Sequence, residues 1–384
     1  MMGLNRFRTS ALCSLCLALA IFVATSQVRA ASYSAIDITP SGMSDFYETA
    51  IAACSGTNLI GWAYGPTVYD SATPHAYLWS GGSRIDLTPA GFSAARAAAI
   101  DGGQIAGYGS GTSTNGNNHA MMWSGSAGTA VDLHPNWLSD SQATDIRGSQ
   151  QVGYGHFSVG GDEHAVLWTG TAASAVNLHP AGYAYSVAYA TNGSQQVGAA
   201  VFNYDIHEHA MLWNGTAASA LDLNPAGFLD TSALGIGGAQ QVGAGGGPAT
   251  AGWTHAILWS GSAQSYVDLN PTKVGDGLIT RSMATGTNGI QQVGYGDNGA
   301  RTYALVWSGT ADSCVDLEQF LPPRLYATGA GSIDAQGNIF GTATDGRGNT
   351  HYILWVPVPE PASLSLVALG GLAMLRRRGG RVGA

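Results

Sequence analysis

A short phrase that ends in tryptophan recurs seven times along this chain, and its period limits the folds that the chain can adopt. The tryptophans are Trp79, Trp123, Trp168, Trp213, Trp259, Trp307 and Trp355, at spacings of 44, 45, 45, 46, 48 and 48 residues. The phrases read HAYLW, HAMMW, HAVLW, HAMLW, HAILW, YALVW and HYILW. A period of about 40–50 residues with strand-like sequence is typical of repeat architectures, in which each copy forms one supersecondary unit.

One complete period predicts four strands. A short strand, Val131–Leu133, ends at His134-Pro135, because proline has no N–H to continue a strand ladder. The other predicted strands cover 143–146, 150–154 and 164–168. In other copies the turn after the second of these four strands is Asn-Gly, a strong hairpin signal. One four-stranded antiparallel sheet per period predicts the blade of a β-propeller, so the fold class is all-β.

A second phrase, centred on Asp-Leu, recurs seven times but is offset from the first. It occurs at Asp37, Asp86, Asp132, Asn177, Asp222, Asp268 and Asp316. The chain therefore begins with this strand and ends with a tryptophan strand. If the Asp-Leu strand is the fourth of each blade, residues 34–39 complete the last blade and close a seven-bladed ring, which removes exposed sheet edges. An open solenoid of hairpins is the alternative.

The repeat resembles the HAF repeat of extracellular bacterial proteins. The resemblance rests on HAxLW, the following Asp-Leu, a strand of small residues and GxQQVG, and it covers roughly residues 34–355. The chain departs from that pattern after Asp-Leu, where it has Thr-Pro-Ala-Gly or His-Pro instead of Gly-Thr-Leu-Gly-Gly. The resemblance implies an extracellular repeat protein and supplies no catalytic residues.

The N-terminal residues 1–30 predict a secretory signal peptide. Arg6 and Arg8 precede an apolar run over 11–24, and Val28-Arg29-Ala30 offers small residues at the positions of a cleavage site. A membrane-spanning helix would need a longer run of about 20 apolar residues.

The C-terminal residues 357–384 resemble a PEP-CTERM sorting signal. The resemblance is carried by the tripeptide, an apolar stretch over 362–375 and a final basic cluster, namely Pro359, Glu360, Pro361, Arg376, Arg377 and Arg378. It implies transient membrane insertion, cleavage by an exosortase-type sorting enzyme, and delivery to the cell surface, outer envelope or extracellular matrix. The predicted organisation is a signal peptide (1–30), a propeller (31–356) and a sorting signal (357–384).

Charge argues against nucleic acid as a partner. Removal of both ends takes seven of the 15 basic residues and one of the 24 acidic residues. Eight basic and 23 acidic residues remain, a net charge of about −15, which repels phosphate. Cys54 and Cys314 also remain, and we expect two unpaired thiols because a closed ring separates them.

The repeated polar residues predict structural roles. A metal site needs three or four ligands at one point, whereas one histidine per blade spreads the set around the ring. The set is His75, His119, His164, His209, His255 and His351. We expect each histidine to bond backbone within its blade, and each repeated aspartate to accept hydrogen bonds from turn N–H groups. We expect no metal and no cofactor.

Ligand binding is better sought where the copies differ. These variable segments are the loops between the second and third strands of each blade, when the Asp-Leu strand is counted as the fourth. The candidates are Tyr69, Asp70, Asp162, Glu163, Tyr204, Asp205, Glu208 and Trp253. Aromatic rings stack on the apolar faces of sugars and carboxylates accept hydroxyl hydrogen bonds, so this composition suits carbohydrate. The rings of Trp137, Tyr183 and Phe228 occupy equivalent positions and are expected instead to fill gaps between blades.

Catalytic motifs are missing from the sequence. It contains no GxSxG, phosphate-binding loop or HExxH. A glycoside hydrolase needs two carboxylates about 5–10 Å apart, which Asp162 or Glu163 with Asp205 or Glu208 could supply. The predicted function is a non-catalytic interaction or matrix module for exopolysaccharide or envelope proteins. The alternatives are a polysaccharide hydrolase or lyase, and a structural protein without a ligand.

Overall fold

The computed structural model describes residues 32–65, 73–158, 161–203, 205–275 and 277–358. The predicted signal peptide lies outside the described residues, and so do Pro359, Glu360, Pro361, Arg376, Arg377 and Arg378. The chain divides into two units, one of 1–33 with 357–384 and one of 34–356, and the second holds the repeats. No helix in the described part is long and apolar enough to cross a membrane.

The repeats form four-stranded antiparallel sheets, which we number as blades 1 to 7 along the chain. In blades 1 to 6 the order of strands in the sheet is the order along the chain. Blades 1 to 3 consist of β2 (Thr49–Ser55), β3 (Asn58–Ala63), β4 (His75–Ser80) and β5 (Ser83–Asp86); β6 (Phe92–Asp101), β7 (Gln104–Gly111), β8 (His119–Trp123) and β9 (Val131–Asp132); and β10 (Asp140–Arg147), β11 (Gln150–His156), β12 (Glu163–Trp168) and β13 (Val176–Asn177).

Blades 4 to 6 repeat this pattern, with one inserted hairpin before blade 6. They consist of β14 (Tyr183–Thr191), β15 (Gln196–Phe202), β16 (Glu208–Trp213) and β17 (Leu221–Asp222); β18 (Asp230–Gly237), β19 (Gln240–Gly246), β20 (His255–Trp259) and β21 (Val267–Asp268); and β24 (Arg281–Thr287), β25 (Gln292–Asp297), β26 (Thr302–Trp307) and β27 (Val315–Asp316). The inserted hairpin pairs β22 (Lys273–Val274) with β23 (Gly277–Leu278).

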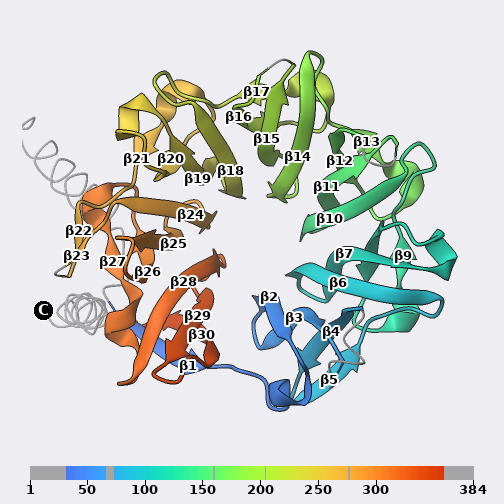
Figure 1. Ribbon diagram of the computed structural model, residues 1–384, viewed down its shortest axis with the longest axis horizontal. Coiled ribbons are helices and arrows are strands. Elements are labelled where there is room, and N and C mark those ends of the chain that lie inside the picture. Colours follow the sequence, from blue (N-terminus) through green and yellow to red (C-terminus); the bar gives the residue numbers. More distant parts are fainter. Residues whose placement is uncertain (1–31, 66–72, 159–160, 204, 276, 359–384) are drawn as a thin grey trace, which may run out of the picture. The chain divides into compact units, whose positions relative to one another are not determined.

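The seventh blade joins the two ends of the repeat region. Its sheet has the order β1-β30-β29-β28, in which β1 (Tyr33–Asp37) lies beside β30 (Thr350–Pro357), followed by β29 (Ile339–Asp345) and β28 (Leu325–Ile333). Figure 1 shows this meeting of blue and red strands, and the strands nearest the centre of the ring are β2, β6, β10, β14, β18, β24 and β28. The predicted seven-bladed propeller, closed by an N-terminal strand, is confirmed.

Side chains also join the last blade to the first. Ile51 of β2 and Phe340 of β29 share a buried apolar cluster with Tyr352 of β30. The N–H of Ile51 donates to the Tyr352 hydroxyl at 3.1 Å. Tyr352 stands where most other copies have alanine, so the residue at the closing interface differs from the repeat.

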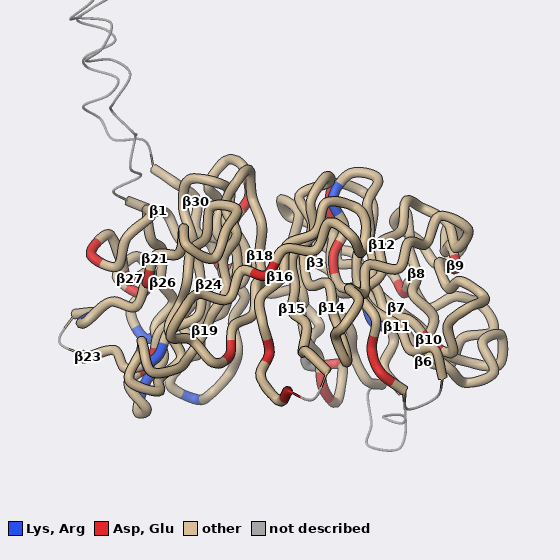
Figure 2. The backbone as a smooth tube through the Cα atoms, turned by 90° about the horizontal axis from the view of Figure 1, so that it is seen from above, with Lys and Arg blue, Asp and Glu red and all other residues tan. Residues whose placement is uncertain are grey.

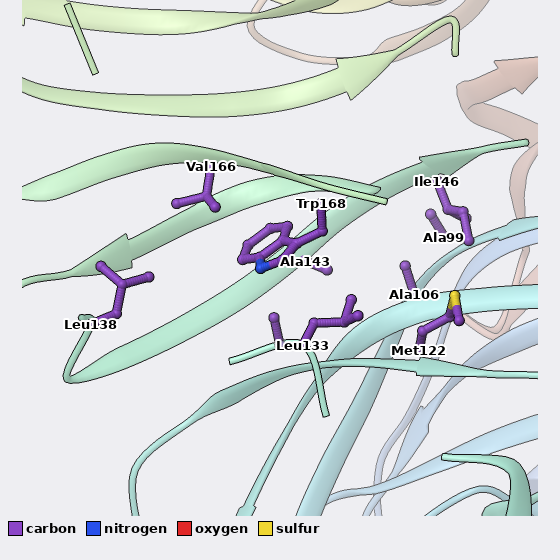
Figure 3. Packing of buried hydrophobic residues seen from close by; sticks show 10 residues of the cluster. Ala99, Ala106, Met122, Leu133, Leu138, Ala143, Ile146, Val166 and Trp168 are labelled. Atoms are coloured by element: carbon purple, nitrogen blue, oxygen red, sulfur yellow. The ribbon is translucent and has the colours of Figure 1, made fainter. Parts of the chain in front are cut away.

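The repeated tryptophans form the cores between neighbouring blades. Six are fully buried and Trp79 is only 5% exposed. Trp168 packs against Leu133 of the preceding blade and Ala143 of its own, as Figure 3 shows. The same pairing of a tryptophan with the Asp-Leu leucine of the previous blade recurs in the next cores, as with Trp213 and Leu178. Large aromatic side chains contribute much of the energy of such cores.

A β-bulge in the first strand of each blade explains the second glycine of the GxQQVG phrase. In blade 3 the pairing of β10 with β11 shifts between Ala143 and Asp145. The shift brings the carbonyl oxygen of Gln142 so close to Gly153 that an added Cβ would lie 1.9 Å from it. The extra residue, Thr144, donates its hydroxyl to the Ala188 oxygen of blade 4 at 2.8 Å. The bulge therefore links the blades and requires glycine opposite it.

Candidate functional site

The repeated histidines bind the repeated aspartates within each blade. In five blades the histidine Nδ1 lies 2.7–2.8 Å from an aspartate Oδ2, in the pairs His75–Asp86, His119–Asp132, His209–Asp222, His255–Asp268 and His351–Asp37. The predicted backbone partner of the histidines is wrong, because the side chain of the fourth strand lies closer. The prediction for the aspartates is confirmed, as the second oxygen of Asp86 accepts the Thr88 N–H at 2.8 Å.

These pairs hold the fourth strand to the third and do not form a shared site. In the described part of the chain, no three His, Cys, Asp or Glu side chains gather in a way that could hold a metal ion. Cys54 and Cys314 are free thiols, and burial raises the pKa of each to about 12. Neither thiol is therefore activated as a nucleophile.

The residues predicted to bind a ligand fall into three groups. Tyr69, Asp70 and Tyr204 lie outside the described residues. Glu163 and Glu208 begin the third strands of blades 3 and 4, and Asp162 and Asp205 lie in the loops just before them. Trp253 lies in the corresponding loop of blade 5 and is 49% exposed.

Glu208 is the centre of a network that joins blades 4 and 5. One carboxylate oxygen accepts the hydroxyls of Tyr185 at 3.1 Å and Tyr189 at 3.5 Å. The other oxygen accepts the Ser232 hydroxyl of β18 at 2.5 Å. A carboxylate with three hydroxyl partners is well oriented, and its position is fixed by two first strands.

Glu163 lies in the same electrostatic neighbourhood. Its Oε1 is 3.7 Å from His156 Nε2, and the other ring nitrogen of His156 is 2.7 Å from Asp140. Burial raises the pKa of Glu163, His156 opposes this, and the negative charges of Asp140 and Glu208 add to it. Burial and the carboxylates of Glu208, Glu163 and Asp230 raise the pKa of Tyr185 to about 12. The charge of Glu208 in blade 4 therefore acts on Tyr185 of the same blade and on Glu163 of blade 3.

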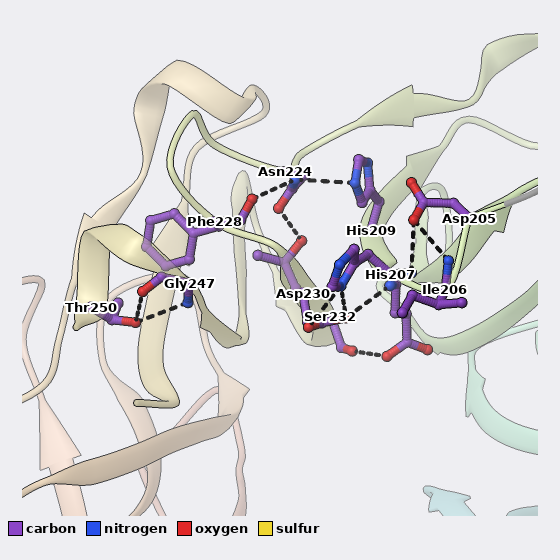
Figure 4. A network of polar contacts seen from close by, with 12 residues as sticks. Asp205, Ile206, His207, His209, Asn224, Phe228, Asp230, Ser232, Gly247 and Thr250 are labelled. Atoms are coloured by element: carbon purple, nitrogen blue, oxygen red, sulfur yellow. Dashed lines mark hydrogen bonds and ion pairs between the residues drawn. The ribbon is translucent and has the colours of Figure 1, made fainter. Parts of the chain in front are cut away.

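Asp205 and Asp230 shape the loop between them, as Figure 4 shows. Asp205 Oδ1 accepts the N–H groups of Ile206 at 2.7 Å and His207 at 3.2 Å, and these bonds lower its pKa. The His207 ring nitrogen lies 3.1 Å from both oxygens of Asp230. Asp230 also accepts the N–H of Glu208 at 3.1 Å. Asp205 thus acts within its own loop, whereas Asp230 connects that loop to blade 5.

A cavity of about 400 Å³ adjoins this network between blades 5 and 6. Asp230 and Ser232 line one side, Met283 of β24 lines another, and Gly252 of the Trp253 loop lies at the edge. Ser232 and Met283 were not among the predicted site residues, because neither belongs to a motif. The available signal was Ala244, which also lines the cavity and replaces a tyrosine found in other copies.

The rings expected to fill gaps do pack against the blade cores. Phe228 is buried in the core between blades 4 and 5, and Tyr183 and Trp137 lie against the two preceding cores. Their predicted equivalence is wrong for Trp137. The N–H of Leu138 donates to Pro135, as that of Phe228 does to Pro225, so Leu138 takes the equivalent position.

The opposite face has a larger cavity of about 550 Å³, at the turns between first and second strands. Asp101, Arg147 and Asp334 line it. Asp101 accepts hydrogen bonds from Arg147 at 3.3 Å and from the Gly148 N–H at 2.7 Å. Asp334 accepts the N–H and the side-chain amide of Asn338. These groups bond to each other and to the turns, so this cavity is the weaker candidate.

Comparison with known proteins establishes only the fold. No family model matches the sequence, and no curated protein matches it. The β-propeller domain of the Trilobed protease from Pyrococcus furiosus is similar, with a TM-score of 0.53, 9% identity, and coverage of 81% of this chain and 94% of that one. A puromycin-hydrolyzing peptidase of Mycobacterium tuberculosis has a TM-score of 0.53, 14% identity, and coverage of 84% and 54%. This chain thus matches about half of that peptidase.

Proposed function

We propose that the protein is an exported, non-catalytic propeller that binds polysaccharide or an envelope partner through the loops before the third strands of blades 3 to 5. The observation that carries the proposal is the Glu208 carboxylate, which two tyrosines and the cavity-lining Ser232 hold in place, with Trp253 exposed in the neighbouring loop. Exposed rings stack on sugar faces, and oriented carboxylates accept sugar hydroxyls.

A glycan array with residues 31–358 tests this proposal. We expect Trp253→Ala to weaken binding about 5- to 10-fold, because loss of one stacking ring costs roughly 1 kcal/mol. Tyr47→Ala is the matched control, since Tyr47 is 57% exposed but lies before blade 1. Absence of binding to every glycan would reject recognition of polysaccharide and favour an envelope-protein partner or a purely structural role.

A polysaccharide hydrolase or lyase is the second candidate. One observation favours it: burial and the charges of Asp140 and Glu208 raise the pKa of Glu163, and glycoside hydrolases pair a carboxyl group of raised pKa with a second carboxylate. Release of reducing ends from a bound glycan, lost in Glu208→Gln, would make the protein an enzyme. Binding without product would leave the non-catalytic proposal in place.

Export and sorting belong to the same proposal. Support comes from the signal-peptide pattern of 1–30 and from the PEP-CTERM resemblance of 357–384. An exosortase-type enzyme would then be a transient partner, and membrane contact would end at cleavage. Mass spectrometry of the envelope fraction should find a chain that lacks both ends, whereas an uncleaved chain in the cytoplasm would contradict export.

A further inference from the structure

Blades 4, 5 and 7 lack an aromatic residue that the other four blades share. The residue after the bulge-facing glycine of the second strand is aromatic in those four blades, as Trp62, Tyr108, Tyr154 and Tyr295. In blade 5 this residue is Ala244, and it pairs with Ser232 of the first strand. In blade 3 the same pair is Tyr154 with Gln142. Two large side chains are thus replaced by two small ones.

The cavity between blades 5 and 6 lies at this replacement. Ala244 and Ser232 both line it, together with the apolar side chains of Leu234 and Met283. Its volume of about 400 Å³ lies within the range of about 300–1,000 Å³ that is usual for small-ligand sites. The lining thus combines apolar side chains with the polar residues Asp230 and Ser232, a combination that suits one sugar ring.

Asp230 is the one charged residue among those described as lining the cavity, and Arg281, two residues before Met283 on β24, is paired with Asp297 at 2.8 Å. Between residues 140 and 230 the sequence contains eight acidic residues, and its only basic residue is Arg147. Arg147 bonds Asp101 at the turns between first and second strands, away from the loops before the third strands. Near the cavity, the described partners of Asp230 are a histidine and a backbone N–H. Figure 2 shows red segments near β14 to β18. Such a field attracts protonated amines and repels uronic acids.

We propose that this cavity binds one residue of a polysaccharide that carries free amino groups. The ammonium group lies near Asp230 and Glu208, and the apolar face of the sugar packs on Leu234 and Met283. This inference rests on the proposed function, since it names the polysaccharide class and the position of the site.

The test is calorimetric titration of the full-length chain with a glucosamine oligomer, its N-acetylated counterpart and a galacturonate oligomer, in mildly acidic buffer. We expect the glucosamine oligomer to bind at least about tenfold more tightly than the other two, and to lose affinity as salt rises. Ala244→Tyr should abolish binding, and Ala244→Ser should retain it. The tyrosine is the residue of blades 3 and 6 at this position, so the fold accommodates it there.

Three results would overturn the inference. Equal binding of the N-acetylated or galacturonate oligomer would reject the amine but leave polysaccharide recognition intact. Unchanged glucosamine affinity in Ala244→Tyr would reject the cavity as the binding site. If Ala244→Tyr does not fold, Ser232→Gln gives the same information, because it introduces on the first strand the residue that blade 3 has there. Failure to bind any of the three oligomers would reject the inference, and the glycan array then decides the proposed function separately.

Discussion

At the residue scale, Asn177 replaces the repeated aspartate in blade 3 and changes the proton affinity of its histidine. Burial and the neighbouring His179 lower the pKa of His164 to about 4. In blade 4 the hydrogen bond that His209 donates to the Asp222 carboxylate raises the pKa of His209. The two histidines hold equivalent places in neighbouring blades, so the carboxylate accounts for much of the contrast.

We expect Asn177→Asp to raise the pKa of His164 from about 4 towards the ordinary histidine value. In the parent chain His164 binds a proton less readily folded than unfolded, so stability falls as the pH drops from the ordinary histidine pKa towards 4. The variant should lose less stability over that range. NMR titration and urea unfolding at several pH values measure both effects, with Asn192→Asp as a control in a distant turn. An unchanged His164 titration would contradict the expectation.

The sequence predicts the role of the repeated aspartates but not their histidine partners. Asp132 lies two residues before His134, so the turn N–H that donates to its carboxylate is local. The pairing of Asp132 with His119 depends on the register of the two paired strands. Asp132 on β9 lies opposite Met121 on β8, two residues after His119. Register between strands cannot be fixed from side-chain pattern when neither face is exposed to water.

At the scale of elements, the bulge and its glycine recur in all seven blades. The glycines are Gly61, Gly107, Gly153, Gly198, Gly243, Gly294 and Gly341, and an added Cβ would lie 1.8–2.2 Å from a first-strand oxygen at each. The repeated glycine therefore marks a close backbone approach rather than a turn.

We expect Gly153→Ala to destabilise the protein by roughly 2–3 kcal/mol, because the methyl group forces the bulged strand away. Gly128→Ala is the control, since nothing lies within 4 Å of a Cβ at Gly128. Urea unfolding of both variants gives the difference. A loss of stability for Gly153→Ala no greater than for Gly128→Ala would show that the bulge yields without cost.

Strand type and order are predicted well from the sequence, and strand ends less well. The predicted strand 143–146 is the centre of β10, which begins at Asp140. The inserted hairpin of β22 and β23 was not predicted, because Lys273-Val274 and Gly277-Leu278 are too short to show an alternating pattern. The position of Leu138 was missed because Trp137 beside it is the larger apolar residue.

At the scale of the whole molecule, the offset between two repeats is sufficient to predict closure. The seven Asp-Leu strands and seven tryptophan strands are offset, so the repeat region begins with an Asp-Leu strand and ends with a tryptophan strand. These two strands, β1 and β30, pair with each other. The candidate site depends on other information. Its cavity lies where blade 5 has two small side chains, Ala244 and Ser232, beside Met283 of blade 6, which is a property of the packed ring rather than of a motif.

Ring closure by β1 is the central structural claim, and thermal unfolding of a chain without residues 34–39 tests it most directly. Removal exposes the edge of β30 and deletes the bonds that Ile38 and Thr39 make to Tyr352 at 2.9 Å. We expect the melting temperature to fall by more than about 10 °C, since a loss of several kcal/mol shifts Tm by about 2–4 °C per kcal/mol. A melting temperature equal to that of the intact chain would contradict closure by this strand.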